Sequence, residues 1–330
     1  MKAMETKAKK KISKDNVLIF FLKNRALLLV LIFFILLSVA TDTFLTSSNM
    51  VSLARQIAAN GIIGVGYTFL LASDSVDLSA GYMMCMIGII SGLLSQTGMP
   101  FICILILCAV IAVICSSFNA VIENKFNLPP FLVTLAMQQV FRGVLMLLSN
   151  GSPISNLNEG IIYMGQGYIG PIPFSVLLML VFIVIGHIIF SRTQFGRNVI
   201  AVGGNPEAAR VSGIDVNKTR VYVSALLGFT IAIMALVSCG RIASAQTTLG
   251  GDTVMDIIAA VVIGGTPMGG GSTVVGTLFG CLVIGLISNG LNLLKVSSYW
   301  QMVSKGVIIL VAVILDVYSE RIYDRMRNKD

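Results

Sequence analysis

Long apolar runs recur along the whole chain, separated by short polar or glycine-rich stretches. Most of them approach the roughly 20 apolar residues that an α-helix needs to cross a bilayer. The eighth run, residues 253–265, is too short for a full crossing. The pattern predicts an all-α polytopic membrane protein with about ten transmembrane helices. The predicted spans are residues 22–41, 56–73, 78–95, 101–122, 129–149, 172–190, 219–239, 253–265, 273–289 and 298–317.

The composition supports this prediction. Of the 330 residues, 56% are hydrophobic and 12% are charged, and the mean hydropathy is +0.90. A soluble domain usually carries about 25% charged residues. The net charge of +8 does not indicate a nucleic-acid partner, because the basic residues gather at the chain ends and in one loop instead of on a folded face.

The distribution of basic residues predicts the orientation in the membrane. With the N-terminus inside, 18 of the 23 Lys and Arg residues fall on the cytoplasmic side and 3 on the outer side. Residues 1–21 then form a basic cytoplasmic tail and residues 22–330 a single transmembrane domain, with both termini in the cytoplasm. On this topology spans 2–5 and 7–10 run in opposite directions, so they are candidates for two inverted halves of the kind found in transporters.

Two groups of polar residues interrupt the apolar runs. Asp74 and Asp77 lie in a short break between spans 2 and 3. Either Asp77 caps a helix that starts at Leu78, or Ser75 and Ser79 cap the start of span 3, unless the carboxylates line a substrate route. Gln138 and Arg142 are four residues apart in span 5 and share one helix face. That face is expected to meet protein or water; the pair either lines a path or holds helices together by hydrogen bonds.

A glycine-rich segment runs from residue 264 to residue 280 and includes Gly265 and Gly270. It lacks the Lys-Ser/Thr pair of a phosphate-binding Walker A loop, and no Gly-Lys pair occurs in the chain, so the sequence predicts no ATPase motif of its own. We interpret the segment, which contains Pro267, as a break between two short membrane helices. Gly276 and Gly280 are spaced for close helix packing.

No set of residues for catalysis or metal binding stands out. His187 is the single histidine, which removes most general-base schemes. The six cysteines lie almost entirely in apolar stretches and form no C-x-x-C pair. The sequence therefore predicts neither an enzyme nor a site for a metal ion or cofactor.

Residues 191–220 form a long charged loop between apolar runs. Asn205 and Pro206 are suited to the start of a short helix, Glu207 to its first turn and Gly213 to the left-handed position after its end. These start and stop signals indicate a rigid docking element. Its charged side chains and the small residues Ala208 and Ala209 would contact a partner. The alternative is an amphipathic segment resting on lipid headgroups, for which Arg192, Arg197 and Arg210 would serve.

Four stretches resemble one family. FGRNVIAVGGNPEAARVSGIDV, residues 195–216, is similar to the main cytoplasmic loop of sugar-importing ABC permeases of the ribose, xylose and arabinose type. SVDLSAG, LPPFLVTLA and IAAVVIGGTPMGGGSTVVGTLFG also resemble conserved segments of that family and occur in the same order.

The resemblance implies a role and partners. It implies a permease subunit in the bacterial inner membrane that imports a sugar or similar polyol. It further implies two cytoplasmic ATPase subunits, an extracytoplasmic binding protein and a second permease, either another copy or a related chain. The loop at residues 191–220 would couple the permease to the ATPase. The competing hypothesis is a secondary transporter in which Asp74 or Asp77 binds the coupling ion or proton.

Overall fold

The computed structural model describes residues 25–304, apart from 249, 251, 252, 267, 268 and 270–272, together with residues 306, 307, 310, 311 and 314. The described chain is helical except for one hairpin of two-residue strands. The elements are α2 (Arg25–Ala40), α3 (Ser47–Ala72), α4 (Ala80–Gln96), α5 (Phe101–Phe126), α6 (Pro130–Ser149), α7 (Glu159–Gln166), β1 (Tyr168–Ile169), β2 (Ile172–Pro173), α8 (Phe174–Arg192), α9 (Gln194–Gly204), α10 (Pro206–Val211), α11 (Val216–Ile242), α12 (Thr253–Ile263) and α13 (Val274–Leu293).

Helix α3 is the centre of the molecule. It is buried at every residue from Ile57 to Ala72 and packs against α8, α11 and α13. Three glycines make room for these neighbours: Gly61 faces the Met179 side chain of α8, Gly64 faces Thr277 of α13, and Gly66 faces Leu227 and Thr230 of α11. Small residues at such positions let helices approach closely.

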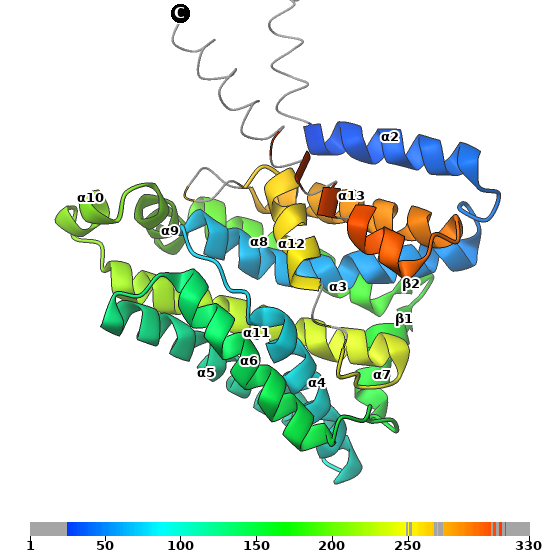
Figure 1. The fold of residues 1–330 in the computed structure, drawn as a ribbon, viewed down its shortest axis with the longest axis horizontal. Helices are drawn as coiled ribbons and strands as arrows, with labels where there is room; N and C mark the ends of the chain where they lie inside the picture. The colour runs from blue at the N-terminus through cyan, green and yellow to red at the C-terminus, as the bar shows by residue number, and fades with distance from the viewer. Residues whose placement is uncertain are drawn as a thin grey trace, which may run out of the picture.

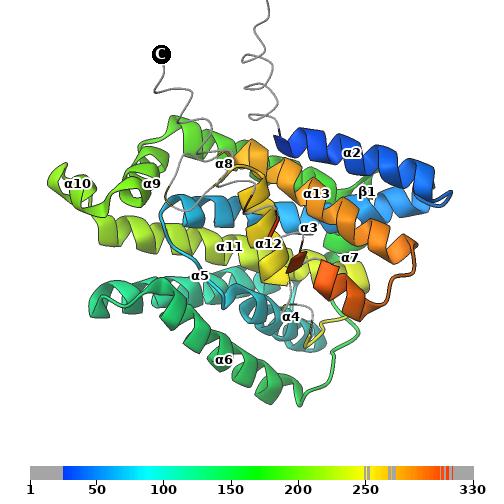
Figure 2. The ribbon, with the colours of Figure 1, turned by 45° about the horizontal axis from the view of Figure 1, so that its top comes forward.

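The remaining helices form layers on both sides of α3. Figures 1 and 2 show α2 and α13 on one side, and α11 followed by α5 and α6 on the other. The apolar stretch of α11 is 72% buried, against 22% for α5 and for α6 and 28% for α8. The latter three helices therefore present most of their apolar surface to the outside, as helices bordering lipid do.

The two ends of the molecule differ. Helices α9 and α10 lie at one end, and α7 lies with the β1–β2 hairpin toward the other (Figures 1 and 2). Among the described residues, α5, α6, α8, α11 and α13 are long and apolar enough to cross a membrane, while α4, α12 and residues 26–40 form shorter apolar helices.

Most predicted spans coincide with helices, with three corrections. Helix α3 begins at Ser47, well before residue 56, because its polar first turns are capped by Thr46, whose hydroxyl accepts the Asn49 N–H at 3.4 Å. A cap by Asp77 directly before Leu78 is wrong, since α4 begins at Ala80 with Ser79, one of the alternative caps, at the N-cap position. Helix α7 and the β1–β2 hairpin had no counterpart in the predicted pattern.

The glycine-rich segment contains the expected break. Helix α12 ends at Ile263 and α13 begins at Val274. The two helices pack backbone to backbone, because a Cβ atom at Gly276 would overlap the Gly264 carbonyl and one at Gly280 would overlap that of Ala260. Gly265 adopts φ +88°, which suits glycine. Gly270 lies outside the described residues.

Candidate functional site

The segment formed by α9 and α10 is a pair of short helices with defined ends. The Thr193 hydroxyl caps α9 by accepting the Gly196 N–H, and the Asn205 side chain caps α10 by accepting the Ala208 N–H at 2.9 Å. Pro206 follows at the first helical position, and Gly213 has φ +83°. The predicted start and stop of the short helix are confirmed.

The α9–α10 segment has a small hydrophobic core of its own. Val202 of α9, Ala209 of α10 and Val216 at the start of α11 are buried together, with Ala201 and Ile214 packed against them. The Ile214 N–H donates to the Ala209 carbonyl at 3.0 Å. The expectation that Ala209 is offered to a partner is therefore wrong, because its methyl group is one of the contacts that fold the segment.

Aromatic and backbone contacts attach α9 to the end of α3. The Phe195 ring of α9 stacks on Phe69 of α3 with centroids 5.8 Å apart, and Phe190 of α8 meets Phe69 edge-on at 5.0 Å. Gly203 lies so close to the Ala72 carbonyl that a Cβ atom there would overlap it. A displacement of α9 would thus act directly on the buried central helix.

The glycine-rich segment also contacts the end of α3. The Gly269 N–H donates to the Leu71 carbonyl of α3 at 3.0 Å. A Cβ atom at Gly269 would lie 2.8 Å from the Gly203 carbonyl oxygen of α9. The end of α3 is thereby held between α9 and the segment that joins α12 to α13.

The outer face of α10 is exposed and mixed in character. Glu207 and Arg210 form an ion pair at 2.7 Å, with side chains 79% and 57% exposed. Ala208 is exposed beside them, and Val211 is 90% exposed. An ion pair so open to solvent contributes little to stability. Arg197, on α9, is also exposed.

Asp215 links the segment to the next helix. Its carboxylate caps α11 by accepting the Lys218 N–H at 3.0 Å and pairs with the Lys218 amino group at 3.1 Å. The backbone hydrogen bond from Lys218, followed by the one from its side chain, lowers the pKa of Asp215. The carboxylate therefore stays ionised, the form that caps best.

A buried polar cluster lies where α3 gives way to α4. Asp77 is 4% exposed, and its carboxylate accepts the Ser79 N–H at 2.7 Å and the Ser79 hydroxyl. The Tyr67 hydroxyl donates to the Asp77 carbonyl, and the Asn119 amide of α5 donates to the Ser79 hydroxyl at 3.0 Å. Asp77 thus holds the start of α4 from two residues before its N-cap, Ser79, instead of capping a helix at Leu78.

Sequence reasoning did not identify three members of this region, Tyr67, Asn119 and Glu123. Glu123 is only 6% exposed and lies one helical turn beyond Asn119 on α5. The signal was available, because two polar residues four apart in an apolar run share a helix face that avoids lipid. Asp74, by contrast, is exposed and has φ +58°.

Gln138 and Arg142 lie on α6. Arg142 is exposed, and its guanidinium carbon lies 5.5 Å from the centroid of the Tyr82 ring of α4. Gln138 is half-buried on the same face. The pair therefore occurs where α6 packs on α4.

Comparisons with known proteins identify the family of this chain. Residues 49–313 match the family described as the permease component of the branched-chain amino acid transport system. The chain belongs to this permease family. The matched range includes α3, the Asp77 cluster, the α9–α10 segment and the glycine-rich segment.

Individual relatives of this permease are named as sugar transporters. It is 38% identical to the ribose import permease protein RbsC of Bacillus subtilis over 86% of this chain and 88% of the relative. It is 36% identical to RbsC of Haemophilus influenzae over 91% and 94%, respectively. It is 28% identical to the xylose transport system permease protein XylH of Escherichia coli over 91% and 92%. No solved structure gave a significant match.

The permease is thus an ABC-type membrane transport subunit related to ribose and xylose permeases. Its long apolar helices agree with a multi-pass protein. Such subunits transport; they are not enzymes.

Proposed function

We propose that this permease is the transmembrane subunit of an importer that moves a pentose or similar polyol into the cytoplasm. The names of its ribose and xylose relatives support the substrate class. The proposed assembly contains an extracytoplasmic sugar-binding protein, two cytoplasmic ATPase subunits and a second permease, either another copy or a related chain. Closed two-fold pairing is the commonest symmetry of oligomers.

The structure of the α9–α10 segment is the main observation that supports this proposal. It is folded by its own small core, its α10 face is exposed, and its α9 is fixed to α3. An ATPase docked on Glu207, Ala208 and Arg210 would move the segment as one body. Contacts of Phe195 with Phe69 and of Gly203 with Ala72 would pass that motion to the central helix.

The proposed topology places both termini, the basic tail of residues 1–21 and the α9–α10 segment in the cytoplasm of a bacterium. The bias of basic residues supports it. Ten spans in a single domain of residues 22–330, with two inverted halves, are part of the same proposal. Gln138, Arg142, Gly265 and Gly270 remain proposed path or packing residues.

The competing hypothesis of ion-coupled transport would assign a coupling role to Asp77. The hydrogen bonds of its carboxylate to Ser79 instead favour a role in holding α4. Asp77→Asn keeps an acceptor oxygen for the Ser79 N–H, so we expect at least about half of the sugar uptake to remain, with dependence on ATP unchanged. Loss of uptake in a variant that inserts normally would instead support a charge-dependent role.

Cysteine crosslinking tests the docking proposal. Ala208→Cys on α10, in a variant whose exposed Cys103 is replaced by Ser, should crosslink to the ATPase subunit in the assembled transporter. Ser48→Cys is the control, because Ser48 is also exposed but lies at the first turn of α3. If no exposed position of α10 crosslinks in a complex that still transports, the docking proposal is wrong.

A further inference from the structure

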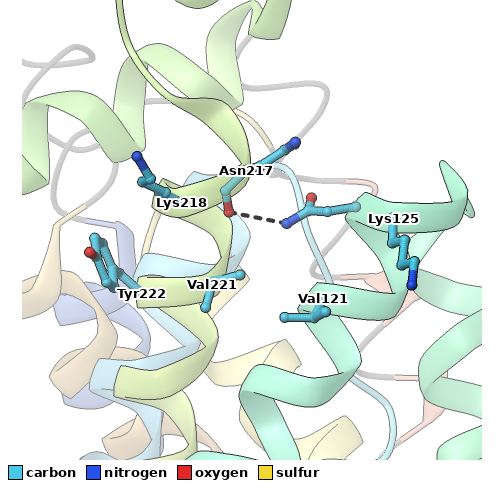
Figure 3. A pocket seen from close by; sticks show the side chains of 7 residues that line it. Val121, Lys125, Asn217, Lys218, Val221 and Tyr222 are labelled. Carbon is cyan, nitrogen blue, oxygen red and sulfur yellow. Dashed lines mark hydrogen bonds between the residues drawn. The ribbon is translucent and has the colours of Figure 1, made fainter.

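Two grooves flank the first turns of α11. One has a volume of about 480 Å³ and lies between α11 and the last turns of α5 (Figure 3). The other, of about 570 Å³, lies between α11 and the residues where α8 gives way to α9. Lys218 and Tyr222 line both grooves, so these two side chains form a ridge between them.

The walls of the grooves are largely apolar and their rims are polar. Val121 and Val221 line the first groove. Ile189, Phe195 and Leu226 line the second. At the rim of the first groove, the Asn124 amide donates to the Asn217 carbonyl at 3.0 Å and ties α5 to α11. Figure 3 shows Lys125 and Lys218 on opposite sides of this groove.

Both grooves continue onto exposed apolar surface of the helices. Phe118, less than one turn before Val121 on α5, is 52% exposed, and Phe229, two turns beyond Tyr222 on α11, is 41% exposed. Ile185, about one turn before Ile189 on α8, is 52% exposed. Tyr222 itself is 59% exposed, and tyrosine is enriched where helices leave the hydrocarbon region. The grooves thus open from a lipid-facing belt toward the end of the bundle.

The charge around the grooves is positive overall. Their lining contains Lys125, Lys218 and one carboxylate, that of Asp215, which pairs with Lys218 at 3.1 Å. In Figure 3 both amino groups point away from the groove. Lysine side chains are long and rotatable, so each can turn toward a phosphate bound there, Lys218 by leaving its ion pair with Asp215. Basic pockets between membrane helices are typical binding places for anionic lipid headgroups.

We infer that the grooves hold one anionic phospholipid that straddles Tyr222. Its phosphate lies at Lys218 and Lys125, and one acyl chain follows each groove. A free phosphate ion would leave both apolar grooves unused. A partner protein would have to cover two open apolar grooves beside exposed apolar surface of α5, α8 and α11. The inference does not depend on the sugar or on ATPase docking.

Lipid retention by the purified full-length permease tests the inference. The protein in detergent is mixed with equal amounts of phosphatidylglycerol and phosphatidylcholine, and bound lipid is counted by native mass spectrometry. The wild type should retain phosphatidylglycerol in preference to phosphatidylcholine, with about a fivefold preference per contacting lysine. The K125Q/K218Q double variant should lose that preference.

Two further variants separate a built site from general charge attraction. Val121→Trp fills the first groove without changing any charge, and we expect it to reduce retention as well. Lys295→Gln removes one charge from an exposed residue after α13, remote in sequence from the grooves, and should behave as the wild type.

Four results would overturn the inference. One is an unchanged preference in K125Q/K218Q, and another is an equal loss in Lys295→Gln. The third is displacement of the lipid by millimolar inorganic phosphate alone, which would show that the site recognises the ion and not the lipid. Retention of phosphatidylglycerol by Val121→Trp at the wild-type level would place the lipid outside the first groove.

Discussion

The α9–α10 segment and the central helix α3 are in contact, but different interactions hold them in place. The segment is organised by local hydrogen bonds to capping side chains such as Asn205, and its α10 face is exposed. Helix α3 has few polar contacts along its buried length and is positioned by glycines that admit neighbouring helices. The segment should therefore stay folded after substitutions of its exposed residues, even where these weaken partner binding. Helix α3 should tolerate almost no added side-chain volume at its glycines.

The largest effect is expected at Gly66 of α3. A Cβ atom there would overlap the Thr230 hydroxyl and press on the Leu227 backbone of α11, so Gly66→Leu should cost about 3 kcal/mol or more. Folded protein in the membrane, measured by fluorescence-detected size-exclusion chromatography, should fall strongly. Gly143→Leu on α6 is the matched control, because nothing lies within 4 Å of a Cβ atom there.

A smaller effect is expected at Gly213. Its φ of +83° is unfavourable for a β-branched residue, so Gly213→Val should strain the connection from α10 to α11 by about 1–3 kcal/mol. We expect normal insertion but reduced co-purification of the ATPase. Gly213→Asn should be milder, since Asn accepts left-handed backbone angles. Equal behaviour of the Val and Asn variants would contradict this reasoning.

A loss of about 1 kcal/mol is expected at the cap of α10. Asn205→Ala removes the acceptor for the Ala208 N–H, so the first turn of α10 should open more often. Hydrogen exchange of residues 206–211 should become faster while that of α3 stays unchanged. Asn205→Asp keeps the cap and should exchange as the wild type does.

The smallest effect on stability is expected at Glu207. Its ion pair with Arg210 is exposed, so Glu207→Lys should change the free energy of unfolding by less than about 1 kcal/mol. The same change reverses the charge of the proposed docking face and should lower sugar-stimulated ATP hydrolysis. Unchanged hydrolysis, together with stronger binding to anionic vesicles, would favour a segment that rests on lipid headgroups.

Features encoded locally could be predicted from the sequence, and features that depend on packing could not. Apolar runs indicated most of the long helices, and the order Asn205, Pro206 and Gly213 predicted α10, because caps and turns act within a few residues. The burial of Ala209 depends on Val202 and Val216, which lie on different helices. For the same reason the sequence did not reveal the partners of the α3 glycines.

The Asp77 cluster also combines features that the sequence predicted with features that depend on packing. The sequence identified Asp77 as a residue that fixes a helix start, but it placed that start at Leu78. The hydrogen bonds from Ser79 to Asp77 are local, but the approach of Asn119 from α5 arises only when α4 and α5 pack together. Helix α7 was missed because eight residues in a polar region give too weak a periodic signal.

In the proposed coupling, α9 passes motion from a docked ATPase to α3. Gly203→Ala and Gly204→Ala test it most directly, because a Cβ atom at Gly203 would overlap the Ala72 carbonyl whereas one at Gly204 meets nothing within 4 Å. Sugar uptake and ATPase co-purification are measured for both variants in the assembled transporter. We expect both variants to retain the ATPase, but Gly203→Ala should lose most uptake, at least about tenfold, while Gly204→Ala transports normally. Equal uptake by the two variants would contradict the proposed coupling.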